Sequence, residues 1–399
     1  MMKTTTTEGA KPSRLAIVDG LRGYALFGLF LVHMTGYFEL YNARPDPSPV
    51  QDWVLWLFLG KSFSLLAVCF GFSFFVMMDG ARRRGESFVG RFAWRLFLLF
   101  VIGWLHSLIY RGDIIAVLAT AGFALIPFDK VRSNRVLLIV AGLLLLQPFL
   151  IYRILAGLMG YDWALAEPLF YNDGGAMRPS LWGTFGELIQ ANLVAGKFSK
   201  WAFYIETGRI VQILGLYLIG LVLGRIRFFA EPERFSRVRW GLLILSIVAI
   251  FPLSYLRDLT CCHSRGPVYW TDVMVSGWTD LAGMAISLLG FVQLWLWGAD
   301  RILKYLASPG RMTLTLYIGQ SLVFVPVYYG FGLHLWDRIT QPESLGLALA
   351  TFAAQLVFAT IWFRHFVYGP LEWLWRAGMK LSFDVPFRRS AKTLKASAR

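Results

Sequence analysis

The sequence predicts an all-α, polytopic membrane protein, a bundle of about ten transmembrane helices with both termini in the cytoplasm. Of its 399 residues, 57% are hydrophobic and only 16% are charged, whereas soluble domains carry about 25% charged residues. Charge comes in short clusters between apolar runs of roughly 20 residues, the length of a membrane-spanning helix. Only helices and closed barrels satisfy their backbone in lipid, and barrel strands would alternate in polarity. The composition excludes a soluble enzyme, a disordered chain and a secreted disulfide scaffold.

Ten candidate spans follow from the apolar runs. They cover about 15–38, 53–78, 90–110, 113–128, 135–157, 201–224, 239–258, 272–298, 303–334 and 345–375. The chain is therefore divided into a polar N-terminal tail (1–13), a membrane domain (14–378) and a basic C-terminal tail (379–399). No cleavable signal peptide is expected, because the first apolar run is too long for one.

The positive charge predicts the orientation of the spans. The formal net charge is +15. With both termini inside, about two-thirds of the 39 Lys and Arg residues fall in cytoplasmic segments, as the positive-inside rule requires. We therefore expect membrane lipid, and no nucleic acid, as a partner of the basic surface. The inner (plasma) membrane is the natural location, and the oligomeric state, including a homo-oligomer, stays open.

The first span carries ionisable residues on one face. Arg22 and His33 are 11 residues apart, which at about 100° per residue places them on the same side of a helix. Asp19 lies one turn before Arg22 and can pair with it. Ionisable groups inside a bilayer mark functional sites by default. Because imidazole accepts a proton near neutral pH, His33 is a candidate general base. The alternative is a packing histidine satisfied by a neighbouring helix.

The third span contains a second histidine with a nearby carboxylate. His106 is predicted to lie at the depth of His33, and Asp113 follows at the outer surface. A carboxylate in this position could orient the imidazole or contact an incoming hydroxyl or amine group. The alternative is a packing histidine followed by an aspartate in a turn.

Polar side chains also occur in the sixth and ninth spans. Glu206 and Arg209 are spaced to pair within one helix. Glu206 and Arg209 form either a structural salt bridge or, together with Gln212, the polar wall of a water-filled cavity that binds the substrate. Gln320 is a further candidate for contact with substrate. Arg311 could bind a phosphate or act as a positive-inside anchor.

The external segment at 158–200 is rich in aromatic and acidic residues. Residues 181–195 within it could form an amphipathic helix that lies on the membrane. The segment is either a structural lid or a surface that binds an acceptor. No metal cofactor is expected, because the histidines do not form a spaced set with cysteines and carboxylates.

Five short motifs follow one another along the chain. They are Asp19-Gly-Leu-Arg22-Gly-Tyr-Ala-Leu-Phe-Gly, Phe63-Ser-Leu-Leu66 with Phe70-Gly71, Gly103 with His106 and Gly112-Asp113-Ile, Gly310-Arg-Met-Thr-Leu-Thr315 with Tyr317 and Gln320-Ser321, and Tyr368-Gly-Pro-Leu-Glu-Trp-Leu-Trp-Arg376. In this order they resemble the YeiB-like membrane protein family, which began as a domain of unknown function. The resemblance covers about residues 14–378.

The YeiB-like family is grouped with the transmembrane acyltransferases, which include the acyltransferase-3 proteins and the heparan-glucosaminide acetyltransferases. The resemblance implies a helix bundle that passes an acyl group from cytoplasmic acyl-CoA to an acceptor at the outer face. Acyltransferase-3 proteins carry Arg, ten residues and then His in the first span, and Arg22 and His33 match this spacing. By resemblance His33 is catalytic and Arg22 assists. Many YeiB-like proteins have Asn at this position, so here the chain leans toward the acyltransferase-3 form.

The residues and the resemblance together lead to one main hypothesis. We expect a membrane acyltransferase that moves an acyl group from acyl-CoA to a hydroxyl or amine of a carbohydrate or other small acceptor. The acyl group expected is acetyl. His33 acts as the general base or carries the acyl group, and His106 and Asp113 orient the acceptor or support the imidazole. Arginine side chains bind the phosphates of the donor. The candidates are Arg22, Arg82, Arg83, Arg91, Arg95 and Arg311.

Two other hypotheses belong to different classes. Asp19, Arg22, His33, Glu206 and Arg209 could form the proton relay of a transporter or flippase for a polar or lipid-linked solute. A structural or sensory membrane protein is the third and needs no pair of histidines. An acyltransferase requires a narrow tunnel with a basic cytoplasmic mouth, whereas a transporter requires a central site between two related halves.

Overall fold

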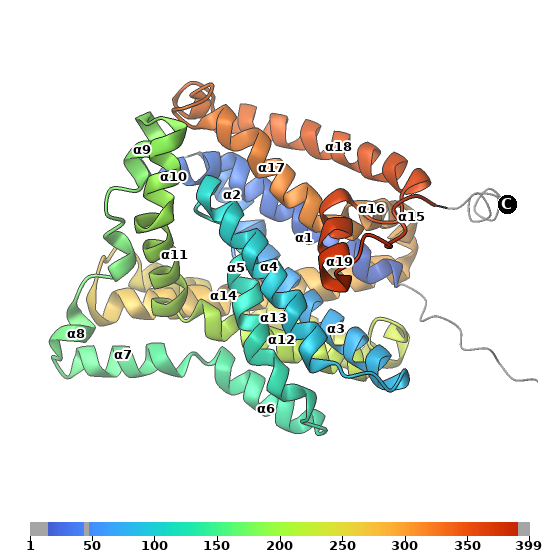
Figure 1. The fold of residues 1–399 in the computed structure, drawn as a ribbon. Coiled ribbons are helices and arrows are strands. Elements are labelled where there is room, and N and C mark those ends of the chain that lie inside the picture. Colours follow the sequence, from blue (N-terminus) through green and yellow to red (C-terminus); the bar gives the residue numbers. More distant parts are fainter. Residues whose placement is uncertain (1–14, 44–47, 390–399) are drawn as a thin grey trace, which may run out of the picture.

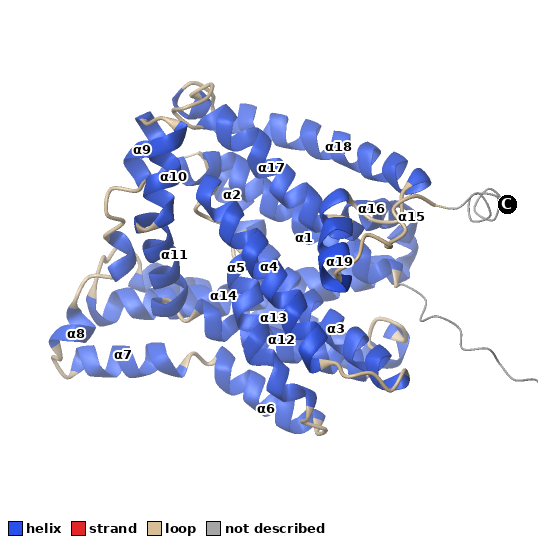
Figure 2. Ribbon diagram, viewed as in Figure 1, coloured by secondary structure: helices blue, strands red, loops and turns tan. Residues whose placement is uncertain are grey.

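The computed structural model describes residues 15–43 and 48–389. The N-terminal tail and residues 390–399 lie outside this part. Figure 2 shows helices joined by loops, and no strand occurs in the described ranges. The α-helices are α1 (Ala16–Thr35), α2 (Pro49–Phe58), α3 (Lys61–Arg83), α4 (Val89–Ile109), α5 (Ile115–Leu125), α6 (Asn134–Leu145), α7 (Pro148–Leu158), α8 (Asp162–Leu165), α9 (Met177–Trp182), α10 (Phe185–Leu193), α11 (Ala195–Glu206), α12 (Arg209–Arg225), α13 (Ser236–Thr260), α14 (Gly266–Leu294), α15 (Asp300–Leu303), α16 (Ala307–Arg311), α17 (Thr313–Tyr328), α18 (Gln341–His365) and α19 (Pro370–Lys380). The predicted all-α class is confirmed.

The described chain has the long apolar helices of a multi-pass membrane protein. Seven segments are long and apolar enough to cross a membrane, namely Ala16–Tyr41, Pro49–Arg83, Val89–Ile109, Asn134–Leu158, Pro232–Thr260, Gly266–Arg311 and Gln341–His365. The bent pair α11 and α12 would make an eighth. Two of the predicted spans, 113–128 and 303–334, correspond to shorter apolar helices, Ile115–Asp129 and Thr313–Tyr328. The count of ten and the orientation of the termini stay predictions.

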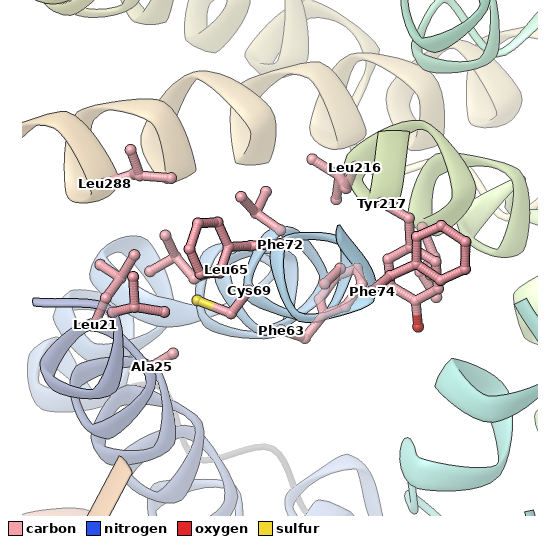
Figure 3. Close-up of a cluster of buried hydrophobic side chains, with 14 of the residues drawn as sticks. Leu21, Ala25, Phe63, Leu65, Cys69, Phe72, Phe74, Leu216, Tyr217 and Leu288 are labelled. Carbon is pink, nitrogen blue, oxygen red and sulfur yellow. The ribbon is translucent and has the colours of Figure 1, made fainter. Parts of the chain in front are cut away.

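The centre of the bundle is formed by α3, which packs against α1, α12 and α14. Figure 3 shows Leu21 of α1, Leu65 and Cys69 of α3 and Tyr217 of α12 within one cluster of buried side chains. A β-carbon at Gly71 of α3 would overlap the backbone of Tyr217. Small residues allow membrane helices to approach this closely, so van der Waals packing holds α3 against α12.

The helix α1 runs through the bundle between two groups of short helices. In Figure 1, α15, α16 and α19 lie at the right of the view, and α9, α10 and α11 lie at the left. The start of α1 contacts α16, where a β-carbon at Gly310 would overlap the backbone carbonyl of Asp19. The segment after α1, a 3-10 helix η1 (Tyr37–Ala43), contacts α9 and α17. The two ends of α1 therefore sit in different surroundings.

The predicted amphipathic helix at 181–195 corresponds to α10. Its Leu188 is fully buried, and Asn192 Nδ2 donates to the carbonyl of Leu108 at 2.9 Å, so α10 packs against the end of α4. At its start Thr184 and Glu187 form a capping box. The backbone N–H of Thr184 donates to the Glu187 carboxylate and lowers its pKa. The segment is thus part of the packed structure.

Candidate functional site

The expected pair on α1 forms. Arg22 Nη1 lies 3.2 Å from Asp19 Oδ1, one turn away, and the same guanidinium donates to Ser73 Oγ of α3. Asp19 is buried, and the Arg22 side chain is 25% exposed. The predicted shared face of Asp19 and Arg22 is confirmed.

The second predicted pair also forms, because the chain reverses between α4 and α5. The tight turn after Ile109 brings Asp113 back against His106, and Asp113 Oδ1 lies 2.8 Å from His106 Nδ1. The other oxygen, Asp113 Oδ2, accepts the backbone N–H of Ala116 at 3.1 Å. Lys200 of α11 donates to the Asp113 carbonyl at 3.1 Å, and its Nζ is 3.7 Å from Oδ2. The carboxylate is fully buried and is held by contacts from three directions.

His33 has partners that sequence reasoning missed. Its Nδ1 lies 2.7 Å from the hydroxyl of Tyr110, and this hydroxyl donates to Glu39 Oε1, also at 2.7 Å. Tyr110 is fully buried at the end of α4, and Glu39 follows α1 in η1. The chain positions of Glu39 and Tyr110 give no signal of this contact, because 71 residues separate them.

Tyr317 of α17 lies beside both imidazoles. Its ring centre is 5.4 Å from that of His106 and 6.3 Å from that of His33. Nε2 of each histidine is buried and has no hydrogen-bond partner among the described residues. We refer to His33, His106, Tyr110, Asp113 and Tyr317 as the histidine cluster. Two imidazoles with buried, unpartnered Nε2 atoms are suited to proton transfer with a bound molecule.

A cavity of about 230 Å³ is lined by Tyr317 and by a set of arginines. Its lining includes four half-buried arginine side chains from four different helices, which we call the arginine cluster. They are Arg22, Arg95, Arg311 and Arg376. Most of the other lining residues are apolar, and Glu372 is among the polar ones. The apolar ones include Leu26, Leu66, Phe70, Leu99, Ile115 and Leu118.

Three of the four arginines lie over aromatic rings. The guanidinium carbon of Arg95 is 3.9 Å from the ring centre of Trp375, and that of Arg311 is 3.8 Å from Phe363. Arg376 lies 4.4 Å above the ring of Tyr368 in the same way. Such stacking holds a guanidinium in place.

Of the six arginines predicted to bind a donor, the structure brings three to this cavity. Arg22, Arg95 and Arg311 line it, and Arg376 was missed because its position depends on how α19 packs. The other three are exposed near the ends of α3 and α4 and pair with carboxylates outside the cavity. These pairs are Arg82 with Asp129, Arg83 with Asp79 and Arg91 with Glu86. Glu86 also accepts a hydrogen bond from Arg84, which lowers its pKa.

The predicted substrate residues of the sixth span lie around a different cavity, of about 200 Å³, whose walls include Arg209 and Gln212. Glu206 and Arg209 do not pair as their spacing suggests, because the chain bends by 62° between α11 and α12 at Gly208. Glu206 instead lies 3.1 Å from Arg153, and Arg209 lies 3.7 Å from Asp280.

The remaining predictions are placed as follows. Gln320 of α17 donates to Gln355 Oε1 of α18 at 2.9 Å and is outside both cavities. In the described part of the chain, no group of three or more histidine, cysteine or carboxylate side chains could hold a metal ion.

Comparison with known proteins supports the YeiB-like resemblance. Residues 223–382 match a family described as "Protein of unknown function (DUF418)". The chain is 26% identical to the uncharacterized protein YxaH of Bacillus subtilis (strain 168), over 95% of this chain and 97% of that protein. It is 27% identical to an uncharacterized 39.9 kDa protein of Bacillus acidopullulyticus, over 92% of this chain and 94% of that protein. It is 23% identical to the uncharacterized protein YeiB of Escherichia coli (strain K12), over 91% of this chain and 95% of that protein.

Proposed function

We propose that the protein is a membrane acyltransferase that uses acyl-CoA, with acetyl-CoA as the first donor to test, and an acceptor hydroxyl or amine such as that of a carbohydrate. The observation that carries the proposal is a single cavity lined both by four arginines and by Tyr317, which contacts two buried histidines. An acyl-CoA donor needs cationic groups for its phosphates, a passage for its uncharged arm and a base close to the thioester. The cavity supplies the arginines and a mainly apolar wall, and the two histidines lie next to Tyr317 at that wall, which supports the proposal.

In the proposed reaction, His33 Nε2 takes the proton from the acceptor hydroxyl or amine. The acceptor oxygen or nitrogen attacks the thioester carbon, its new bond to that carbon forms, and the C–S bond breaks. The imidazolium then returns the proton to the leaving sulfur, so the histidine ends in its starting state. His106, held by Asp113, orients the acceptor or supports His33. Transient transfer of the acyl group to His33 is the alternative route.

The proposal includes a topology. We propose about ten spans with both termini in the cytoplasm and a location in the inner (plasma) membrane, on the strength of the positive-inside bias. In this orientation the arginine cluster lies toward the cytoplasm, where acyl-CoA is found, and the histidine cluster lies nearer the outer face. Membership of the transmembrane acyltransferase superfamily is part of the same proposal, and the five motifs support it.

The donor half can be tested by binding. We would measure the thermal shift of the purified protein with acetyl-CoA and with free CoA, beside the variants Arg311→Ala and Arg91→Ala. Hydrogen bonds to charged groups contribute about 1.5–3 kcal/mol, so Arg311→Ala should weaken binding about tenfold or more. Arg91→Ala is the matched control, because this arginine is exposed and lies outside the cavity. Absence of a shift at millimolar acetyl-CoA, or an equal loss in both variants, would contradict the proposal.

The chemical half can be tested with His33→Ala. This variant should fold and still bind acetyl-CoA, but its rate of CoA release with a membrane extract as acceptor source should fall by about 10²–10⁴-fold, the usual contribution of a general base. His365→Ala is the control, because His365 ends α18 and is exposed, whereas His33 is buried next to Tyr317. Wild-type turnover in His33→Ala would remove His33 from the mechanism.

One observation favours the second candidate, a proton-coupled transporter or flippase. Broken helices often line the substrate sites of transporters, and the bend between α11 and α12 borders the second cavity. Charged residues surround this bend, with Glu206 paired to Arg153 and Arg209 close to Asp280. Proton uptake by proteoliposomes that depends on Arg209 and is independent of acyl-CoA would favour this function over acyl transfer.

A further inference from the structure

We propose that Glu39, acting through Tyr110, holds His33 in the tautomer that leaves Nε2 able to accept a proton. Glu39 and Tyr110 would then be positioning residues for the base. The purpose of this arrangement rests on the proposed acyl transfer, but the arrangement of protons can be tested without any substrate.

The tautomer follows from counting protons along the hydrogen bonds. A carboxylate only accepts hydrogen bonds, so the one hydroxyl proton of Tyr110 is donated to Glu39 Oε1. The contact of 2.7 Å between the Tyr110 oxygen and His33 Nδ1 then needs a proton from the imidazole. Nδ1 of His33 therefore carries the proton, and Nε2 carries a lone pair.

The same count applies to His106 and gives the same result. Asp113 Oδ1 can only accept, so His106 Nδ1 donates to it across 2.8 Å. Both imidazoles therefore present a basic Nε2, and both of these atoms are buried without a partner. The two histidines differ in one respect: His106 has its carboxylate in direct contact, whereas His33 reaches its carboxylate through the hydroxyl of Tyr110. In each case the negative charge also stabilises the imidazolium that forms when the base takes a proton.

The backbone around Glu39 indicates that its position is enforced. Tyr37, Phe38 and Glu39 all have positive φ angles, of 50°, 51° and 78°. Non-glycine residues adopt this conformation only where the surroundings fix it, and such strain collects at functional sites. Here the hydroxyl of Tyr329 donates to the Phe38 carbonyl at 3.2 Å and holds the strained segment.

A glycine keeps space open for this contact. A β-carbon at Gly112 would overlap both Glu39 Oε1 and the hydroxyl oxygen of Tyr110. The turn between α4 and α5 therefore serves both histidines: Asp113 orients His106, and Gly112 leaves room for Glu39 to bind Tyr110.

The test is nitrogen-15 NMR of the histidine rings in detergent, where the shift of each ring nitrogen reports whether it carries a proton. The chain has five histidines, and His33→Ala assigns the signal of His33. We expect His33 to be protonated on Nδ1 in the wild type. Glu39→Gln should shift His33 toward the Nε2–H tautomer, because the amide can donate to Tyr110 and reverse both hydrogen bonds. Tyr110→Phe and Gly112→Ala should also reduce the Nδ1–H population.

The control variant is Tyr217→Phe, which removes the hydroxyl of another fully buried tyrosine that donates to a backbone carbonyl, that of Leu118 at 2.8 Å, and contacts neither Glu39 nor His33. It should leave the tautomer of His33 unchanged. The proposal is overturned if His33 is protonated on Nε2 in the wild type, or if the three test variants change the tautomer no more than Tyr217→Phe does. A thermal unfolding transition is measured for each variant to show that it is folded. Because the three test variants differ in chemistry, the result does not depend on the stability of any single variant.

Turnover then connects the tautomer to the reaction. A general base supplies about 10²–10⁴-fold in rate, and this is the largest loss of kcat expected for Glu39→Gln. The KM for acetyl-CoA should stay near the wild-type value. If acetyl-CoA does not bind while His33 keeps the Nδ1–H tautomer, the acyltransferase proposal fails and the positioning role of Glu39 stands. If acetyl-CoA binds and is turned over but the tautomer does not depend on Glu39, the acyltransferase proposal stands and the positioning role of Glu39 fails.

Discussion

The arginine cluster lines a cavity that the histidine cluster meets through Tyr317, and the two clusters are built in different ways. In the histidine cluster the side chains are buried, and each Nδ1 has a partner at 2.7 or 2.8 Å. In the arginine cluster the side chains are half-buried, and three of the four guanidinium groups rest on aromatic rings. Under the proposed acyl transfer, the difference would suit proton transfer at a fixed position in the histidine cluster and adaptable binding of phosphate charge in the arginine cluster.

The contrast also separates stability from binding. Removing a partner inside a buried, charged network leaves an uncompensated group in the interior, which is costly. Removing a half-buried guanidinium at the wall of a cavity lets water reach the groups that it contacted, which lowers the cost of the loss. Variants at the histidine cluster should therefore lower stability, whereas variants at the arginine cluster should mainly lower ligand affinity.

The largest expected effect on stability is that of Asp113→Ala. The carboxylate is fully buried beside Lys200 and His106, so its loss leaves the ammonium group unpaired. Breaking a buried pair typically costs about 3–5 kcal/mol, measured here by unfolding in mixed micelles. Asp79→Ala is the matched control, since Asp79 pairs with Arg83 at 2.8 Å but is 36% exposed, and such pairs contribute about 0–1 kcal/mol. Equal losses in the two variants would remove the contrast between the clusters.

The arginine cluster should give the opposite result. Arg376→Ala should change the free energy of unfolding by no more than about 1 kcal/mol, and weaken acetyl-CoA binding about tenfold, with a smaller dependence on salt than the wild type. Isothermal titration at two salt concentrations measures the affinity and its salt dependence, and unfolding in mixed micelles measures the stability. Arg83→Ala, an exposed arginine outside the cavity, should leave affinity unchanged. A large loss of stability in Arg376→Ala would show that this arginine is structural.

The smallest effect is expected at the start of α10, the helix that packs against the end of α4. Thr184→Ala removes the N-cap of α10 and should destabilise that helix by about 1 kcal/mol, seen as faster amide hydrogen exchange in α10. Because the pKa of Glu187 is lowered in the folded state, its contribution is present at neutral pH and is lost as the pH falls through that pKa. Thr340→Ala, in the capping box of α18, should affect α18 and leave α10 unchanged. Faster exchange throughout the protein would contradict a local role.

Several parts of the site could be predicted because they are local. Asp19 and Arg22 are one helical turn apart, and His106 and Asp113 are joined by a tight turn, so short spacing was enough. The pairing of Glu206 with Arg209 shows the limit of this reasoning. The prediction assumed one continuous helix, but the chain bends at Gly208, and each side chain finds a partner on another helix.

By itself the sequence determined the all-α class, the apolar helices suited to a membrane and the two histidines as candidates, because hydropathy and helical spacing are properties of neighbouring residues. Only the tertiary structure decided that Tyr110 joins His33 to Glu39, that Lys200 contacts Asp113, and which arginines face the cavity. These contacts join residues 71 to 87 positions apart or depend on how each helix is rotated in the bundle. Packing at close approaches such as Gly310 sets that rotation, and no local pattern in the chain records it.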